Sequence, residues 1–97
     1  MLPNEGNEKM KRFLQKLLNQ VLQRKEFDDI DRAEVFFVFG SKHKTAMCDW
    51  IYGIRVYSNM PLAQRADSLR DLQMTLKRNT QRLLQTSICC TDVIFVD

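Results

Sequence analysis

One stretch constrains the fold more than any other, because its apolar residues recur every three or four positions between Asn7 and Lys25. They are Met10, Phe13, Leu14, Leu17, Leu18, Val21 and Leu22. This spacing places them all on one face of an α-helix. The positions between them are mostly Lys, Arg, Gln and Asn, and Asn7 is suited to cap the start. The sequence therefore predicts an amphipathic helix over residues 7–25.

The next segment predicts an acidic connector followed by a β-hairpin. Residues 26–32 contain Glu and Asp side chains that compete with strand pairing, so we expect a connector there. Residues 33–39 (AEVFFVF) are β-branched and aromatic, which favours a strand. The polar residues 41–44 then form a turn before a second strand at residues 45–57. Gly53 inside that strand indicates a bulge or a close backbone approach.

A second helix and a third strand complete the chain. Ser58 is a cap candidate and Pro61 fits the first turn of a helix that runs to about Thr86. One side of this helix carries Leu62, Ala66, Leu69, Leu72, Leu76, Thr80 and Leu83. At ~1.5 Å per residue it spans nearly 40 Å, so one end is expected to project. Residues 88–96 (ICCTDVIFV) are predicted as the third strand.

The element order α-β-β-α-β predicts an α+β two-layer sandwich, with a three-stranded sheet covered by two amphipathic helices. The chain has 97 residues, of which 44% are hydrophobic and 28% charged, a globular balance for a single domain over residues 1–97. Because the long helix is a crossover connection, the third strand should lie parallel to the second strand or to the first. The sequence leaves that choice open.

The predicted strands carry large apolar residues on both faces, although a two-layer fold leaves one face without a helix. An apolar patch of this kind is seldom left in water. We therefore predict a protein interface, for a second copy or for a different protein, with Phe36, Val38, Trp50 and Tyr52 as its candidate residues. Two alternatives are that one helix covers each face, or that a bulge at Gly53 changes the strand parity.

Catalytic groups are sparse in this chain. The single histidine, His43, lies in the polar turn, and no serine lies in a G-x-S-x-G pattern. The carboxylate pairs Asp28–Asp29 and Asp67–Asp71 lie on the connector and on the outer side of the long helix, where solvated charges are expected. We therefore predict a protein that is not an enzyme and that has no cofactor and no small-molecule substrate.

The three cysteines, Cys48, Cys89 and Cys90, are an odd number with an adjacent pair, which is a poor disulfide framework. We expect buried, reduced thiols. Zinc binding is the alternative, with His43 as a fourth ligand, but adjacent strand residues point to opposite faces, so only one of Cys89 and Cys90 can reach a shared centre. The sequence has no long apolar run and no signal-like start, so we expect an intracellular protein without membrane contact.

RNA binding is the alternative function, because the net charge is +3 and basic residues gather on three predicted surfaces. These are the first helix (Lys9, Lys11, Arg12, Lys16), the polar turn (Lys42, Lys44) and the long helix (Arg70, Lys77, Arg78, Arg82). Trp50 and Tyr52 offer rings for base stacking if they are exposed. The element order resembles that of KH-like domains of the kind found in ribosome-binding factor A, and residues 92–97 look like that family's last strand. This resemblance implies an RNA-binding fold, although the chain has neither a GxxG loop nor a glycine between residues 62 and 84.

Overall fold

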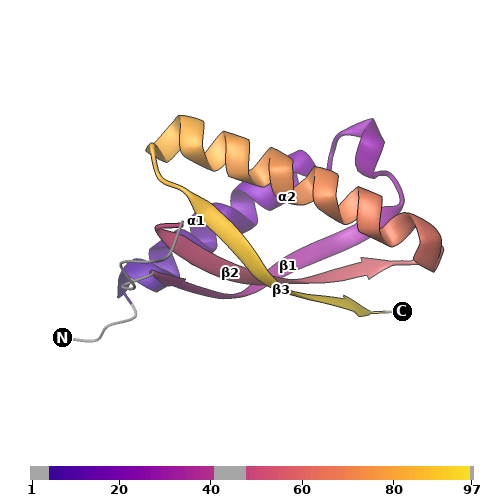
Figure 1. The fold of residues 1–97 in the computed structure, drawn as a ribbon, viewed down its shortest axis with the longest axis horizontal. Helices are drawn as coiled ribbons and strands as arrows, with labels where there is room; N and C mark the ends of the chain where they lie inside the picture. The colour runs from indigo at the N-terminus through magenta and orange to yellow at the C-terminus, as the bar shows by residue number, and fades with distance from the viewer. Residues whose placement is uncertain (1–4, 41–47, 97) are drawn as a thin grey trace.

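A computed structural model describes residues 5–40 and 48–96, and within them the chain follows the order α-β-β-α-β (Figure 1). The elements are α1 (Glu5–Val21), the short 3-10 turn η1 (Lys25–Phe27), β1 (Ile30–Gly40), β2 (Trp50–Ser58), α2 (Leu62–Leu84) and β3 (Ile88–Val96). The α+β class and the element order predicted from the sequence are confirmed. The bounds of β3 are the predicted ones.

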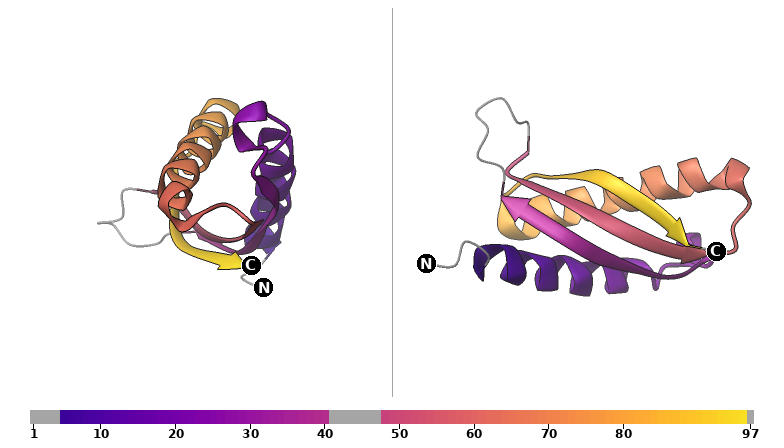
Figure 2. Two further views of the ribbon diagram at one scale, coloured as in Figure 1. Left: turned by 90° about the vertical axis from the view of Figure 1, so that its right-hand side faces the viewer. Right: turned by 90° about the horizontal axis from the view of Figure 1, so that it is seen from below.

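The sheet has the order β1-β2-β3, with β1 antiparallel and β3 parallel to β2. The third strand therefore takes the second strand as its neighbour, one of the two places that the sequence left open. Both helices lie on the same face of the sheet (Figure 2). We call the opposite face of the sheet the outer face. In the right-hand view of Figure 2 the strands therefore lie in front of both helices.

The core lies between the sheet and the two helices. Leu14 and Leu18 of α1 are fully buried there, as the three-four periodicity predicts. They meet Ile54 of β2 and Leu72 and Leu76 of α2, which are also fully buried. Each helix thus contributes its apolar face to one continuous core.

Three predictions for this part of the chain are wrong: the end of the first helix, its cap and the start of the first strand. The first helix ends at Val21 rather than near Lys25. Asn7 lies inside α1 instead of capping it, and its Oδ1 accepts a hydrogen bond from the Gly40 N–H at 3.2 Å. The strand β1 begins at Ile30, within the predicted connector, because Ile30 is buried and pairs with Ser58 while the neighbouring acid stays exposed.

The second strand was predicted from residue 45, which is too early. In the structure β2 starts at Trp50, and Cys48 and Asp49 lie before the strand. Residues 45–47 fall outside the described residues. The Asp49 N–H instead donates to the Ser87 carbonyl at 3.0 Å. This bond ties the entry to β2 to the entry to β3.

The long helix is shorter than expected and is exposed at both ends. Ser58 does not cap it, since its Oγ accepts the Met60 N–H, and α2 begins directly after Pro61. The helix ends at Leu84 because Gln85 adopts a left-handed conformation with φ 53°. Leu62 is 79% exposed at the start, which projects beyond the strands (Figure 1). Neither described helix has the length and apolar character that crossing a membrane requires.

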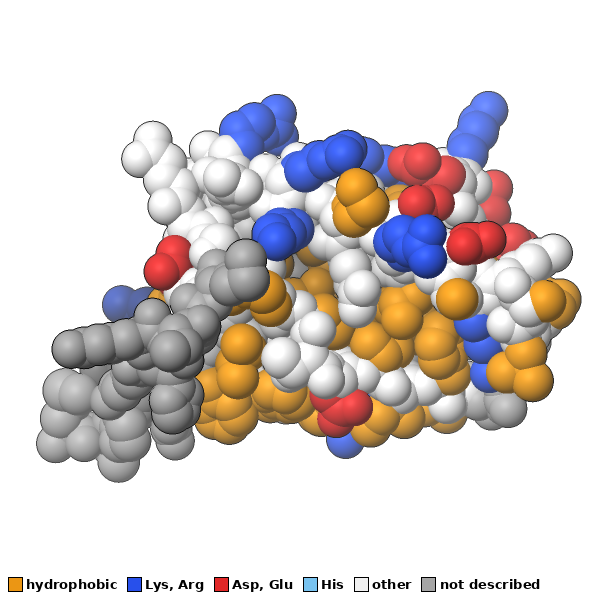
Figure 3. Space-filling view, viewed as in Figure 1, with side chains coloured by type: hydrophobic (Ala, Val, Ile, Leu, Met, Phe, Trp, Pro, Cys, Tyr) orange, Lys and Arg blue, Asp and Glu red, His pale blue; other side chains and the backbone are white. Residues whose placement is uncertain are grey.

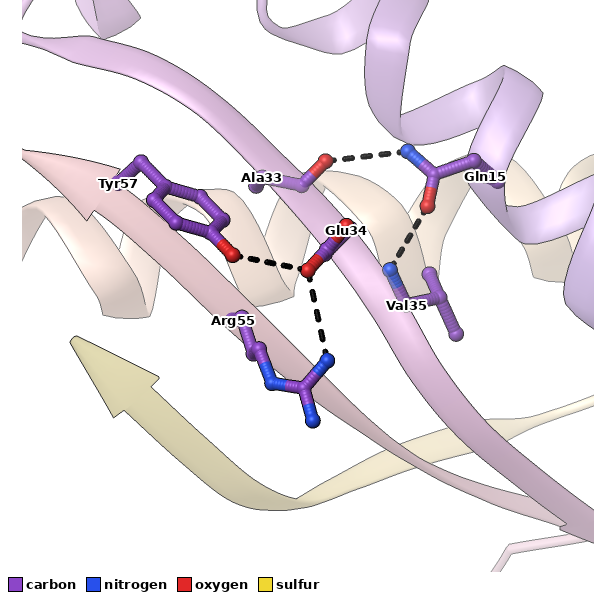
Figure 4. Close-up of polar contacts among 6 residues, drawn as sticks. All are labelled: Gln15, Ala33, Glu34, Val35, Arg55 and Tyr57. Carbon is purple, nitrogen blue, oxygen red and sulfur yellow. Dashed lines mark hydrogen bonds and ion pairs between the residues drawn. The ribbon is translucent and has the colours of Figure 1, made fainter. Parts of the chain in front are cut away.

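One edge of the sheet is covered by a side chain of α1. The Gln15 amide donates to the Ala33 carbonyl at 3.0 Å and accepts from the Val35 N–H at 2.7 Å (Figure 4). These bonds satisfy backbone groups of β1 that do not face β2. Because an unpaired edge invites further strand pairing, Gln15 both fastens α1 to the sheet and protects this edge.

Candidate functional site

The outer face of the sheet carries a group of exposed and half-buried apolar side chains. We call Phe36, Phe37, Phe39, Ile51 and Ile94 the aromatic patch. The rings of Phe36 and Phe37 meet edge to face at 5.0 Å, and those of Phe37 and Phe39 lie 5.4 Å apart. Phe39 is 50% exposed and Ile94 is 40% exposed. The patch therefore draws on all three strands, with Ile51 beside Phe39 and Ile94 beside Arg55 in the register of the sheet.

A bulge in β1 and a glycine in β2 together create this patch. Val35 pairs with Ile54 and Phe37 pairs with Gly53, so Phe36 is the extra residue between them. Gly53 has no side chain on the outer face, and the Phe37 ring occupies that space. A Cβ at Gly53 would overlap the Phe37 ring and would lie 2.8 Å from Cζ of Phe36. The prediction of a close backbone approach at Gly53 is confirmed, and the unpaired residues lie beside it in the two neighbouring strands, Phe36 in β1 and Thr91 in β3.

A polar network lies beside the aromatic patch, and Figure 4 shows the contacts among Glu34, Arg55 and Tyr57. The Tyr57 hydroxyl donates to the Glu34 carboxylate at 3.0 Å, and the Arg55 guanidinium lies 3.4 Å from the same oxygen. The Tyr57 hydrogen bond is the main cause that lowers the pKa of Glu34, with Arg55 and Arg32 adding to it. Arg55 also lies over the Phe36 ring at 4.8 Å. This network bounds the aromatic patch with charged groups that already have partners.

Three of the four predicted interface residues lie outside the aromatic patch. Val38 and Tyr52 are 4% and 1% exposed and belong to the core beneath the helices, so their expected place on the outer face is wrong. The bulge at Phe36 reverses the parity of β1, which turns Val38 inward. Trp50 shares the inner face with Tyr52 and is half-buried against the core, and Phe36 alone lies in the aromatic patch.

The cysteines differ from the expected set of reduced thiols. Cys48 and Cys89 form a disulfide that joins residues 41 positions apart, with their Cα atoms 5.9 Å apart. Cys90 keeps a free thiol on the other side of the strand, as the alternation of strand side chains requires. Burial is the main cause that raises the pKa of Cys90, and burial likewise raises the pKa of Tyr52.

Among the candidate catalytic and metal-binding residues, the structure joins Cys48 to Cys89 in a disulfide, which uses both thiols. The acids Asp28, Asp29, Asp67 and Asp71 are all exposed, as expected for solvated charges. Among residues 5–40 and 48–96, no three His, Cys, Asp or Glu side chains form a cluster that could hold a metal ion. His43 lies outside the described residues.

The basic residues of the two helices are placed largely as predicted. Lys9, Arg12 and Lys16 of α1 are exposed and Lys11 is half-buried; Arg70, Lys77, Arg78 and Arg82 of α2 are all exposed. Figure 3 shows Lys and Arg side chains gathered over α2 and hydrophobic side chains over the sheet below it. Lys42 and Lys44 of the polar turn lie outside the described residues. Tyr52 is buried and offers no ring for base stacking.

Sequence reasoning missed Phe37, Phe39, Ile51 and Ile94 as members of the candidate site. The run of three phenylalanines in residues 36–39 was the available signal, but strict alternation assigns only part of it to one face. Comparison with models of protein families, with curated proteins and with solved structures finds no match for this chain. The candidate site therefore rests on the geometry of the outer face.

Proposed function

We propose that this protein is a non-enzymatic protein–protein interaction module, which acts as a homodimer or as a subunit of a larger complex. The observation that supports this function is the aromatic patch on the sheet face without helices. In the simplest two-layer fold that face is polar. Here Phe39 and Ile94 remain 50% and 40% exposed, and Phe36, Phe37 and Ile51 are half-buried.

The energetic gain from covering the patch is large relative to the stability of a small domain. Full burial of a large apolar side chain contributes roughly 1.5–3 kcal/mol, so the exposed parts of Phe39 and Ile94 represent about half of that for each residue. A domain of this kind is stable by only ~5–15 kcal/mol. Burying Phe39 and Ile94 against a partner would therefore contribute a free energy that is a substantial fraction of the domain's own stability.

The rest of the outer face has the composition of an interface rim. A standard interface buries ~800 Å² on each partner and combines an apolar centre with a polar rim. The adjacent Glu34, Arg55 and Tyr57 network supplies polar groups beside an apolar centre, which is the usual arrangement. A second copy is the simplest partner, since an isologous contact uses the same patch twice. The projecting start of α2 is a second surface available to a complex.

Light scattering after size-exclusion chromatography tests the homodimer directly. We expect a dimer for the wild-type chain and a monomer for Phe39→Asp, because the variant places a charge in the centre of the contact. Lys16→Glu is the matched control, since Lys16 is exposed on α1 and outside the aromatic patch. A wild-type chain that stays monomeric at every concentration contradicts self-association.

The heteromeric form of the proposal has its own test. A photo-crosslinking amino acid at Phe39 should capture a partner protein in cells, and the same group at the exposed Lys16 of α1 should not. The interaction module is refuted if the purified chain is monomeric and the crosslinker at Phe39 captures no protein.

RNA binding is a second candidate function, supported by the exposed Lys and Arg side chains of α2. Residues 72–86 contain Lys77, Arg78 and Arg82 and no acidic residue. Filter binding to a mixed RNA pool should then weaken steeply with salt, and Arg78→Glu with Arg82→Glu should reduce the affinity. Arg24→Glu with Lys25→Glu, two exposed positions outside α2, is the control, because it changes the net charge by the same amount. Absence of binding even at low salt rules this function out.

A further inference from the structure

An apolar recess lies where the start of α1, the start of β2 and the end of α2 meet. Its volume is about 310 Å³. It is lined by Gly6, Lys9, Met10, Phe13, Trp50 and Leu84. Trp50 and Phe13 are half-buried walls, Met10 is buried, and Leu84 is 44% exposed. The recess opens on the helix side of the sheet and is separate from the aromatic patch.

The position of Trp50 in this recess is fixed from two sides. The Gly40 N–H donates to Oδ1 of Asn7, which ties the start of α1 to the end of β1. The Trp50 ring packs over Gly40, with Cζ3 3.6 Å from where a Cβ would lie, and approaches Gly6 on the other side. A side chain held in this way gives the recess a formed wall before any ligand binds, which lowers the ordering cost of binding.

Among the described residues, the charge at the recess has one sign. Lys9 is the only ionisable residue of the lining that the structure describes, and its side chain is exposed. The other described lining side chains are apolar, and none of them is a carboxylate. An apolar ligand with a negative end therefore matches both the walls and the single ammonium group.

We propose that this recess binds an amphiphilic anion, a short unbranched alkyl chain that ends in a carboxylate. The alkyl chain contacts Trp50 and Phe13, and the carboxylate meets the Lys9 ammonium at the opening. The volume lies at the low end of the range of roughly 300–1,000 Å³ for small-ligand sites, which suits a short chain. This site goes beyond the proposed protein interface and does not depend on it.

Trp50 is the only tryptophan in the chain, so its fluorescence reports on the recess alone. The probes are sodium hexanoate, sodium octanoate and octylammonium chloride, each below the concentration at which it forms micelles. Octanoate should change the Trp50 emission saturably. It should bind about 15-fold more tightly than hexanoate, because each buried methylene contributes about fourfold. Octylammonium, with the same chain and the opposite charge, should bind more weakly than octanoate.

Two variants separate the charge from the apolar walls. Lys9→Glu should reverse the preference between octanoate and octylammonium, whereas Lys16→Glu, an exposed position of the same helix outside the recess, should leave it unchanged. Leu84→Asn, which removes apolar surface without adding charge, should weaken binding of all three probes. Circular dichroism checks that each variant is folded, and Lys9→Glu keeps the test decisive if Leu84→Asn does not fold.

Three results would overturn the proposal. The first is a Trp50 emission that does not saturate with octanoate. The second is equal affinity for octanoate and octylammonium in the wild-type protein. The third is an octanoate affinity that is the same in folded Lys9→Glu as in the wild type.

Discussion

Replacing Gln15 with alanine should destabilise the fold by removing the two hydrogen bonds that join α1 to the edge of β1. The variant loses the hydrogen bond to the Ala33 carbonyl at 3.0 Å and the bond from the Val35 N–H at 2.7 Å. Each such bond contributes ~0.5–1.5 kcal/mol, so the two together contribute about 1–3 kcal/mol. Alanine is a slightly better helix former than glutamine and offsets a small part of this loss. We expect a net destabilisation of about 2 kcal/mol.

This loss should be measurable by thermal and chemical unfolding. For a domain of this size, 1 kcal/mol corresponds to ~4–8 °C in Tm, so Gln15→Ala should lower Tm by about 8–16 °C. Urea unfolding should give the same change in free energy. Gln15→Glu is a second informative variant, because a carboxylate still accepts the Val35 N–H but cannot donate to the Ala33 carbonyl. We expect it to be destabilised as well.

The control is Gln20→Ala, an exposed position of the same helix. Exposed substitutions of this kind change stability by no more than ~0.5 kcal/mol. If Gln15→Ala and Gln20→Ala have the same stability, the Gln15 amide does not fasten the strand edge and the reasoning is refuted.

Three further predictions follow from the core, the strand entry and the glycine of β2. Leu76→Ala should lower the free energy of unfolding in urea by about 2–5 kcal/mol because Leu76 is fully buried, whereas Leu62→Ala should change it by less than ~0.5 kcal/mol. Hydrogen bonds from Ser87, with a further one from Thr86, lower the pKa of Asp49. Its carboxylate therefore stabilises the fold above its unfolded pKa of about 3.9, and the contribution is lost as pH falls through the lower folded value. The stability difference between wild type and Asp49→Asn, measured in urea, should thus shrink from pH 6 towards pH 2, and a constant difference would contradict this. Gly53→Ala should destabilise by about 1–3 kcal/mol because the new Cβ overlaps the Phe37 ring, and a double-mutant cycle with Phe37→Ala should remove most of that cost.

The sequence alone determined the elements and their order. The three-four spacing from Met10 to Val21 identified the buried face of α1, and the same spacing around Leu72 and Leu76 identified the centre of α2. The bounds of β3 were also predictable, since its β-branched and aromatic run is isolated between polar residues. These features are local, because the helix period and strand propensity depend on neighbouring residues in the chain.

The tertiary structure decided which strand residues face outward. Strict alternation fails at Phe36, where the extra residue opposite Gly53 reverses the parity, so Val38 turns into the core. A bulge is set by pairing with another strand and leaves little trace in the sequence of its own strand. The sequence did predict an apolar outer face. Because the bulge was not foreseen, Phe36 is the only member of the aromatic patch that was named.

Contacts between segments that are distant in the chain could likewise not be predicted from the sequence. The pairing of Cys48 with Cys89, the neighbour of β3 and the contact of Gln15 with β1 each join residues that are far apart in the chain. Periodicity specifies which side of an element is apolar, but it does not specify which other element meets that side. Those choices are made when the whole chain packs around one core, because only then do backbone groups and side chains from different elements find their partners.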